Sequence, residues 1–180
     1  DELKEAGIYS VVISLALIMF YIWLRFEWQF AVASVIALLH DVIITVGLFV
    51  ISGVQFDLAT LAAILTVAGY SINDTVVVFD RIREFMRKFR KMDLVELLDL
   101  SINTTLSRTV MTSFTTLLAL IALFAFGGEA IRGFTFALIF GIVIGTYSSI
   151  CVASPLLVVF NLRRKIPEGE EASTEEAGAL

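Results

Sequence analysis

The chain has 180 residues, of which 58% are apolar and only 17% are charged, and its formal net charge is −5. This composition excludes an ordinary water-soluble domain, because a chain of this length cannot bury so many apolar side chains in one core. The sequence also holds one His, one Cys and no phosphate-binding glycine loop. We therefore expect no metal or organic cofactor, no nucleic-acid partner, and no enzymatic or nucleotide-driven activity.

Five apolar segments are long enough to cross a bilayer, whose core of about 30 Å needs about 20 helical residues. We expect these spans at about residues 7–24, 31–53, 58–79, 109–127 and 134–160. The alternative for the two spans that carry charge, 31–53 and 58–79, is a re-entrant or buried soluble helix. The sequence thus predicts an all-α, polytopic transmembrane helix bundle with short loops.

The two ends of the chain differ from this membrane domain, which we place at residues 7–162. Residues 1–6 form a polar lead-in without an initiator Met or a basic signal-peptide region, so we interpret the chain as part of a longer protein. Residues 163–180 are rich in Glu and lack apolar periodicity, which predicts a disordered tail.

Most of the Lys and Arg residues lie at Arg25, between residues 81 and 108, and at 163–165. Because cytoplasmic loops collect these residues, the N-terminus is expected outside and the C-terminus in the cytoplasm. Within the linker at 81–105, apolar residues at helical spacing and a cap at Asp93 predict two short amphipathic helices at the membrane surface. They would serve either as a basic anchor on anionic lipid or as a docking surface for a cytoplasmic partner.

Charged residues within the hydrocarbon need partners, because each costs about 2.5–3.5 kcal/mol on insertion scales. Asp74 and Arg108 lie at compatible depths from the same side, so we expect a buried or half-buried ion pair between them. Polar residues continue on the same helix faces (Thr66, Tyr70 and Asn73 beside Asp74; Thr112 and Thr116 beyond Arg108). The pair is either a structural ion pair that fixes helix register or a proton relay.

Other intramembrane residues give weaker signals. Asp41 lies near the membrane midplane, and the adjacent His40 projects about 100° away on a helix, so the two are not expected to form one site. His40 alone is as consistent with a helix contact as with a functional role. Small residues at Gly141 and Gly145, and at Gly69, predict close helix packing.

Several runs resemble one known family. They are Val67-Ala-Gly-Tyr-Ser-Ile-Asn-Asp-Thr-Val-Val-Val-Phe-Asp-Arg-Ile-Arg-Glu84, Phe26-Glu-Trp28, Leu39-His-Asp-Val42, Ser107-Arg-Thr109, Phe126-Gly-Gly128 and Gly145-Thr-Tyr-Ser-Ser149. Together they cover about residues 1–160 and are similar to helices two to six of the SecF branch of the SecD/SecF family of bacterial protein-export membrane proteins, within the resistance–nodulation–division (RND) superfamily.

The resemblance implies a multi-pass protein of the bacterial cytoplasmic (inner) membrane that pairs with SecD. It would assist SecYEG in moving unfolded polypeptides across the membrane, with the proton-motive force as energy source and protons as coupling ions. YajC and membrane lipids are further implied partners. The family's proton-conducting aspartate and arginine fall on Asp74 and Arg108. The alternatives are a small-molecule exporter of the same superfamily and a non-conducting scaffold subunit.

Overall fold

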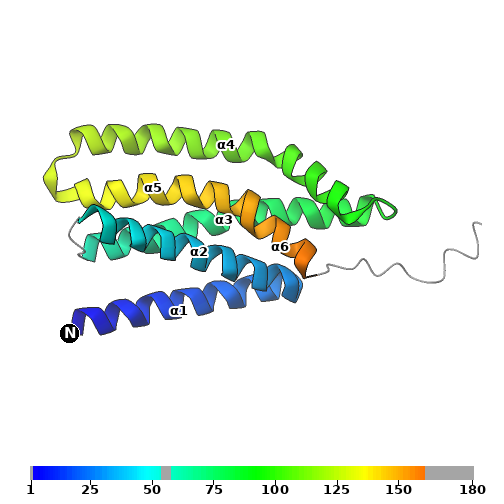
Figure 1. Ribbon diagram of the computed structural model, residues 1–180, viewed down its shortest axis with the longest axis horizontal. Helices are drawn as coiled ribbons and strands as arrows, with labels where there is room; N and C mark the ends of the chain where they lie inside the picture. The colour runs from blue at the N-terminus through cyan, green and yellow to red at the C-terminus, as the bar shows by residue number, and fades with distance from the viewer. Residues whose placement is uncertain (1, 54–57, 161–180) are drawn as a thin grey trace, which may run out of the picture.

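The computed structural model describes residues 2–53 and 58–160, and all its regular elements are helical. Long helices run side by side along one axis of the molecule, with α1 and α4 at opposite edges and α3 and α5 between them (Figure 1). Their bounds are α1 Glu2–Arg25, α2 Trp28–Ser52, α3 Leu58–Lys88, α4 Leu94–Phe126 and α5 Arg132–Ser148. A short turn of 3-10 helix, η1 (Glu129–Ile131), precedes α5; a π-helical turn, η2 (Ser149–Ala153), and α6 (Ser154–Val159) follow it.

The helices agree with the expected membrane spans. Four helical segments are long and apolar enough to cross a bilayer: Trp28–Ser52, Leu58–Lys88, Leu94–Phe126 and the segment Glu129–Val159. The first expected span, 7–24, falls on α1, which has 24 residues and is about 36 Å long at 1.5 Å per residue. The apolar stretch assigned to it, Val12–Arg25, is shorter, so membrane crossing by α1 stays a prediction.

The ends of the predicted domain need one correction. The lead-in expected at 1–6 is not separate, because α1 begins at Glu2; the first residues, Glu-Leu-Lys-Glu-Ala, are good helix formers and continue the helix outward. The acidic tail expected at 163–180 and residues 54–57 lie outside the described residues. The turn between α4 and η1 contains Gly128, whose φ of 80° requires a residue without a side chain.

The linker at 81–105 is not a pair of separate surface helices. Residues 81–88 continue α3, and residues 94–105 form the first turns of α4, so only a short turn separates the two. The reason is that Ile82 and Phe85 keep the helical phase of the span before them and are buried against the bundle. The predicted cap is present, since the Asp93 carboxylate accepts a hydrogen bond from the Val95 N–H at 3.0 Å. We call this end of the molecule, with Arg25 and residues 81–91, the basic end.

Close packing of α3 against α5 forms the middle of the bundle. A Cβ atom on Gly141 would lie 2.3 Å from Cγ2 of Val67, and one on Gly145 would lie 3.0 Å from Cβ of Ser71. Only glycine permits this approach of the two backbones. Gly69 was expected to pack in the same way and does not: no atom of another element lies within 4 Å of the position of its missing side chain.

The last span is helical but not uniform. Its π-helical turn at 149–153 comes directly before Pro155, which has no N–H to donate to the preceding turn. Ser154 instead donates its hydroxyl to the Ser149 carbonyl five residues earlier, at 3.3 Å. The turn thus accommodates the proline without ending the helix.

Candidate functional site: buried carboxylates between the central helices

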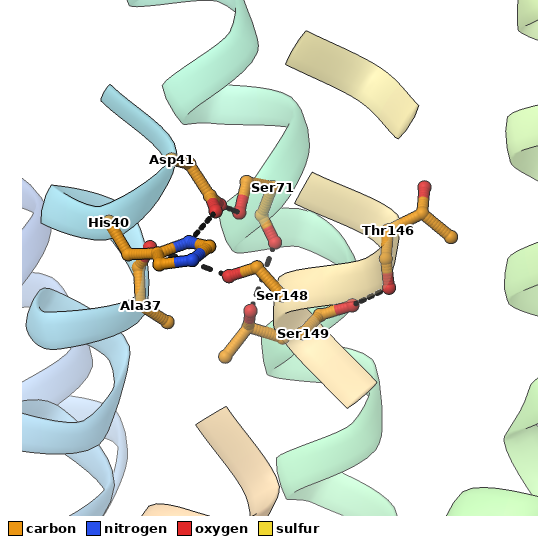
Figure 2. Close-up of polar contacts among 8 residues, drawn as sticks. Ala37, His40, Asp41, Ser71, Thr146, Ser148 and Ser149 are labelled. Atoms are coloured by element: carbon orange, nitrogen blue, oxygen red, sulfur yellow. Dashed lines mark hydrogen bonds and ion pairs between the residues drawn. The ribbon is translucent and has the colours of Figure 1, made fainter. Parts of the chain in front are cut away.

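Asp41 lies at the centre of a polar contact between α2 and α3. Its side chain is fully buried, and its Oδ2 accepts a hydrogen bond from the Ser71 hydroxyl of α3 at 2.6 Å. Its Oδ1 lies 3.0 Å from Nδ1 of His40 (Figure 2). The expectation that His40 and Asp41 would be separate was wrong, because the two side chains bend toward each other despite their different directions on the helix. Both carboxylate oxygens therefore have a partner.

The third helix of this contact, α5, approaches through its small residues. Ser148 donates to the Ala37 carbonyl of α2 at 3.4 Å, and Ser149 donates to the Thr146 carbonyl of its own helix at 3.0 Å (Figure 2). Because Gly145 faces Ser71, the backbone of α5 closes over the Ser71–Asp41 hydrogen bond. The result is a buried, hydrogen-bonded carboxylate enclosed by three helices.

Asp74 lies one turn after Ser71 on α3, and its environment differs from that of Asp41. Only 3% of the residue is exposed, and its Oδ2 atom is buried with no hydrogen-bond partner among the described residues. A buried carboxylate without a partner is unfavourable when it is ionised. Among the described residues, Asp74 is thus a buried carboxylate with one oxygen that has no hydrogen-bond partner.

Arg108 does not form the expected ion pair with Asp74. The two are at matching depth, since Asp74 lies 14 residues before Lys88 at the end of α3 and Arg108 lies 14 residues after Leu94 at the start of α4. However, the buried face of α4 runs through Thr105, Thr109 and Ser113. Arg108 projects beside this face and is exposed.

The polar faces of α3 and α4 meet at a different residue, Tyr70. Its hydroxyl lies 2.8 Å from Oγ1 of Thr116 and donates to the Thr112 carbonyl at 3.2 Å. Asn73, which was expected on the same face as Asp74, is exposed. Asn73 and Arg108 are thus both at the surface of the chain, whereas Asp74 is buried.

Two hydroxyl residues of this region were not identified from the sequence as site residues. Ser71 supplies the partner of Asp41, and Ser113 joins α4 to α5 through a 2.7 Å contact with Thr146 Oγ1. Ser71 is three residues before Asp74 and therefore lies on the same side of the helix. This spacing is the sequence signal that could have identified it. In the described part of the chain, no group of three or more His, Cys, Asp or Glu residues could hold a metal ion.

These features define a multi-pass α-helical membrane protein with buried acidic residues at the centre of its bundle. Residues 1–163 match the family described as "Protein export membrane protein SecD/SecF, C-terminal". The chain belongs to this family.

Two SecF proteins are similar to the chain over most of its length. The chain is 53% identical over 177 residues to protein translocase subunit SecF of Cereibacter sphaeroides, covering 98% of this chain and 55% of that protein. It is 54% identical over 169 residues to protein translocase subunit SecF of Rhodothermus marinus, covering 91% of this chain and 55% of that protein. It thus spans about half the length of these relatives.

The fold is also shared with solved structures. A crystal structure of SecDF in a super-membrane-facing form superposes with a TM-score of 0.85 at 48% identity, covering 97% of this chain and 23% of that chain. A second, of SecDF from Thermus thermophilus, described as a translocon-associated membrane protein, superposes with a TM-score of 0.86 at 49% identity, covering 90% of this chain and 22% of that chain.

Proposed function

We propose that the chain is the membrane-embedded, proton-coupling part of a SecF-type subunit that assists protein translocation across the bacterial cytoplasmic membrane. The observation that carries this proposal is the buried Oδ2 of Asp74, which has no hydrogen-bond partner among residues 2–53 and 58–160. Ionisable residues inside a membrane are costly, and in transport proteins they commonly mark ion or proton pathways.

In this proposal Asp74 carries the proton. Protonation removes the charge from a carboxylate that has no hydrogen-bond partner at Oδ2, and deprotonation requires either water or a cation nearby. Arg108 supplies that cation. Its side chain is exposed and long enough to turn toward Asp74 when the helices shift. The relay therefore alternates between a protonated Asp74 with a distant Arg108 and an ionised Asp74 with a close one.

Asp41 has a supporting role in the proposal. Its two oxygens already have partners in Ser71 and His40, so its hydrogen bonding is satisfied within the bundle. It fixes α2 against α3 one turn from Asp74 and so positions the helix that carries the relay.

The proposed partners and orientation follow the family and the charge pattern. SecD covers the surface that presents Asn73 and Arg108, and the complex acts with SecYEG, with YajC and with unfolded polypeptides in transit. The N-terminus faces outward and the basic end faces the cytoplasm, as the positive-inside rule requires. The proton is the only coupling ion, and no bound cofactor takes part.

The test is gradient-dependent export in inverted membrane vesicles that contain the full-length protein and its partners. Asp74→Asn keeps the shape of the side chain and removes its ability to carry a proton. Asp99→Asn is the matched control, because Asp99 is an exposed carboxylate on α4. We expect the stimulation of export by the proton gradient to be lost in D74N and kept in D99N. Full stimulation in D74N would overturn the relay and favour a scaffold subunit.

A further inference from the structure

A cationic pocket lies at the basic end, where the last turn of α1 meets the end of α3. Its volume is about 370 Å³, and its lining residues are Arg25, Asp80, Arg83, Glu84, Arg87 and Lys88. None of these residues belongs to the buried site around Asp41 and Asp74. The pocket therefore needs an explanation of its own.

The two carboxylates of the pocket are already used within the protein. Asp80 forms an ion pair with Arg25 at 3.0 Å, and Glu84 forms one with Arg81 at 2.7 Å. Arg83 donates to the Arg25 carbonyl at 3.0 Å. In the described parts of the chain, Arg83, Arg87 and Lys88 have no carboxylate within ion-pair distance. Three of the four cations that line the pocket thus have no ion-pair partner among the described residues, while its two carboxylates are paired with Arg25 and Arg81.

An apolar cleft lies beside the same two helices, deeper in the bundle. Its volume is about 290 Å³, and it is enclosed by α1, α2 and α3 through Ser14, Leu17, Ile18, Val42, Ile64, Leu65, Ala68 and Gly69. The open space at Gly69, where close packing was expected, belongs to this cleft. A larger side chain at this position would occupy the cleft.

The spacing between pocket and cleft fits one elongated molecule. Along α1, Ile18 lies seven residues from Arg25, or about 10 Å. Along α3, Gly69 lies 11 residues from Asp80, or about 16 Å. One leaflet of the hydrocarbon core is about 15 Å thick. The cleft therefore lies where the acyl chain of a lipid with its headgroup in the pocket would run.

Two exposed tryptophans place the pocket at the level of lipid headgroups. Trp23 and Trp28 flank Arg25 in the sequence, and more than half of each side chain is exposed. Tryptophan gathers at membrane–water interfaces, where one part of the ring is in lipid and its N–H is in the polar layer. The cationic pocket is thus in the polar layer and the cleft is in the hydrocarbon.

We propose that the pocket and the cleft together bind one anionic phospholipid. Arg83, Arg87 and Lys88 contact its phosphate oxygens, because basic pockets between membrane helices recognise phosphate headgroups. One acyl chain fills the cleft between α1, α2 and α3. This is more specific than a basic surface resting on anionic lipid, since it names a bounded site for a single molecule.

The headgroup half is tested with the full-length protein in complex with its partner, in nanodiscs of phosphatidylcholine doped with phosphatidylglycerol. The number of phosphatidylglycerol molecules kept after detergent extraction is measured by native mass spectrometry. Arg87→Gln with Lys88→Gln removes two pocket cations; Arg90→Gln with Lys91→Gln removes the same charge just beyond the pocket. We expect an affinity loss of about 30-fold in the first variant, from the usual contribution of two basic residues, and little change in the second.

Equal losses in the two variants would show that only the general surface charge matters, and the proposal would be wrong. Equal retention of phosphatidylcholine and phosphatidylglycerol by the unchanged protein would also overturn it.

The acyl half is tested with Gly69→Leu, which fills the cleft, against Gly47→Leu. Gly47 also has no neighbouring atom within 4 Å of its missing side chain, but it does not line the cleft. We expect G69L to lose phosphatidylglycerol and G47L to keep it. A competition experiment with soluble glycerol phosphate separates a lipid from a free anion. If millimolar glycerol phosphate displaces the lipid completely, the pocket binds free anions and the proposed contact of the acyl chain with the cleft is wrong.

Discussion

The hydroxyl of Ser71 donates to the buried carboxylate of Asp41 at 2.6 Å and so joins α3 to α2. The bond lies one turn from Asp74, whose Oδ2 has no partner in the described part of the chain. Two acids in one bundle therefore have opposite environments. The satisfied one joins α2 to α3, and the other has a buried oxygen without such a bond.

Ser71→Ala tests the first of these roles. Removing the hydroxyl leaves a buried carboxylate oxygen unsatisfied, which costs about 1–3 kcal/mol. The apparent melting temperature of the full-length complex in detergent should therefore fall. Thr66→Ala is the control, because Thr66 is an exposed hydroxyl residue on the same helix. The bond is unimportant if S71A melts at the same temperature as T66A.

Gly141→Ala tests the packing of α5 on α3. A methyl group at this position would overlap Cγ2 of Val67, and overpacking costs about 1–3 kcal/mol. The variant should be less stable than Gly47→Ala, which adds the same methyl group into open space.

The double variant V67A/G141A makes the packing test specific. Val67→Ala removes the methyl groups that the new side chain would meet, so it should recover part of the stability lost in G141A. Strictly additive losses in the double variant would mean that the two residues do not meet.

Tyr70→Phe tests the contact between α3 and α4. The change removes a hydroxyl that reaches Thr116 and the Thr112 carbonyl, and such interhelical hydrogen bonds contribute about 0.6 kcal/mol on average. A small but measurable loss of stability is expected. Tyr147→Phe serves as the comparison, because Tyr147 is an exposed tyrosine on α5. Equal stabilities in Y70F and Y147F would contradict the assignment.

Asp41→Asn separates the two acids by function. Asparagine can still accept the Ser71 hydrogen bond, so the helix contact survives while the ionisable group is lost. Proton flux per folded complex should be kept in D41N and lost in D74N. Loss of flux in a stably folded D41N complex would make Asp41 a second member of the relay.

Much of the fold could be predicted from hydrophobic segment length, because a bilayer sets the length of each span independently of its neighbours. The structure of the linker could not be predicted in this way, because the amphipathic pattern at residues 82–89 is the same for a separate surface helix and for a continued span. Its burial depends on packing in one core cluster with residues that are distant in the sequence, such as Ile22 and Leu157.

The contacts of the candidate site could be predicted only in part. Depth along a helix follows from residue counting, which places Asp74 and Arg108 at the same number of residues from the ends of α3 and α4 that meet at the turn between them. Rotation about the helix axis depends on which neighbours pack against it, and here α4 turns its Thr105 and Thr109 face inward, leaving Arg108 outside. Side-chain bending likewise brought His40 to Asp41 against the ideal helical angle.

The most direct measurement of the central claim is proton flux into proteoliposomes that hold the full-length protein and its partner, with a pH-sensitive dye inside. If Asp74 carries the proton, D74N reduces the flux to that of protein-free liposomes while D99N keeps it. Undiminished flux in a correctly folded D74N complex would contradict the claim.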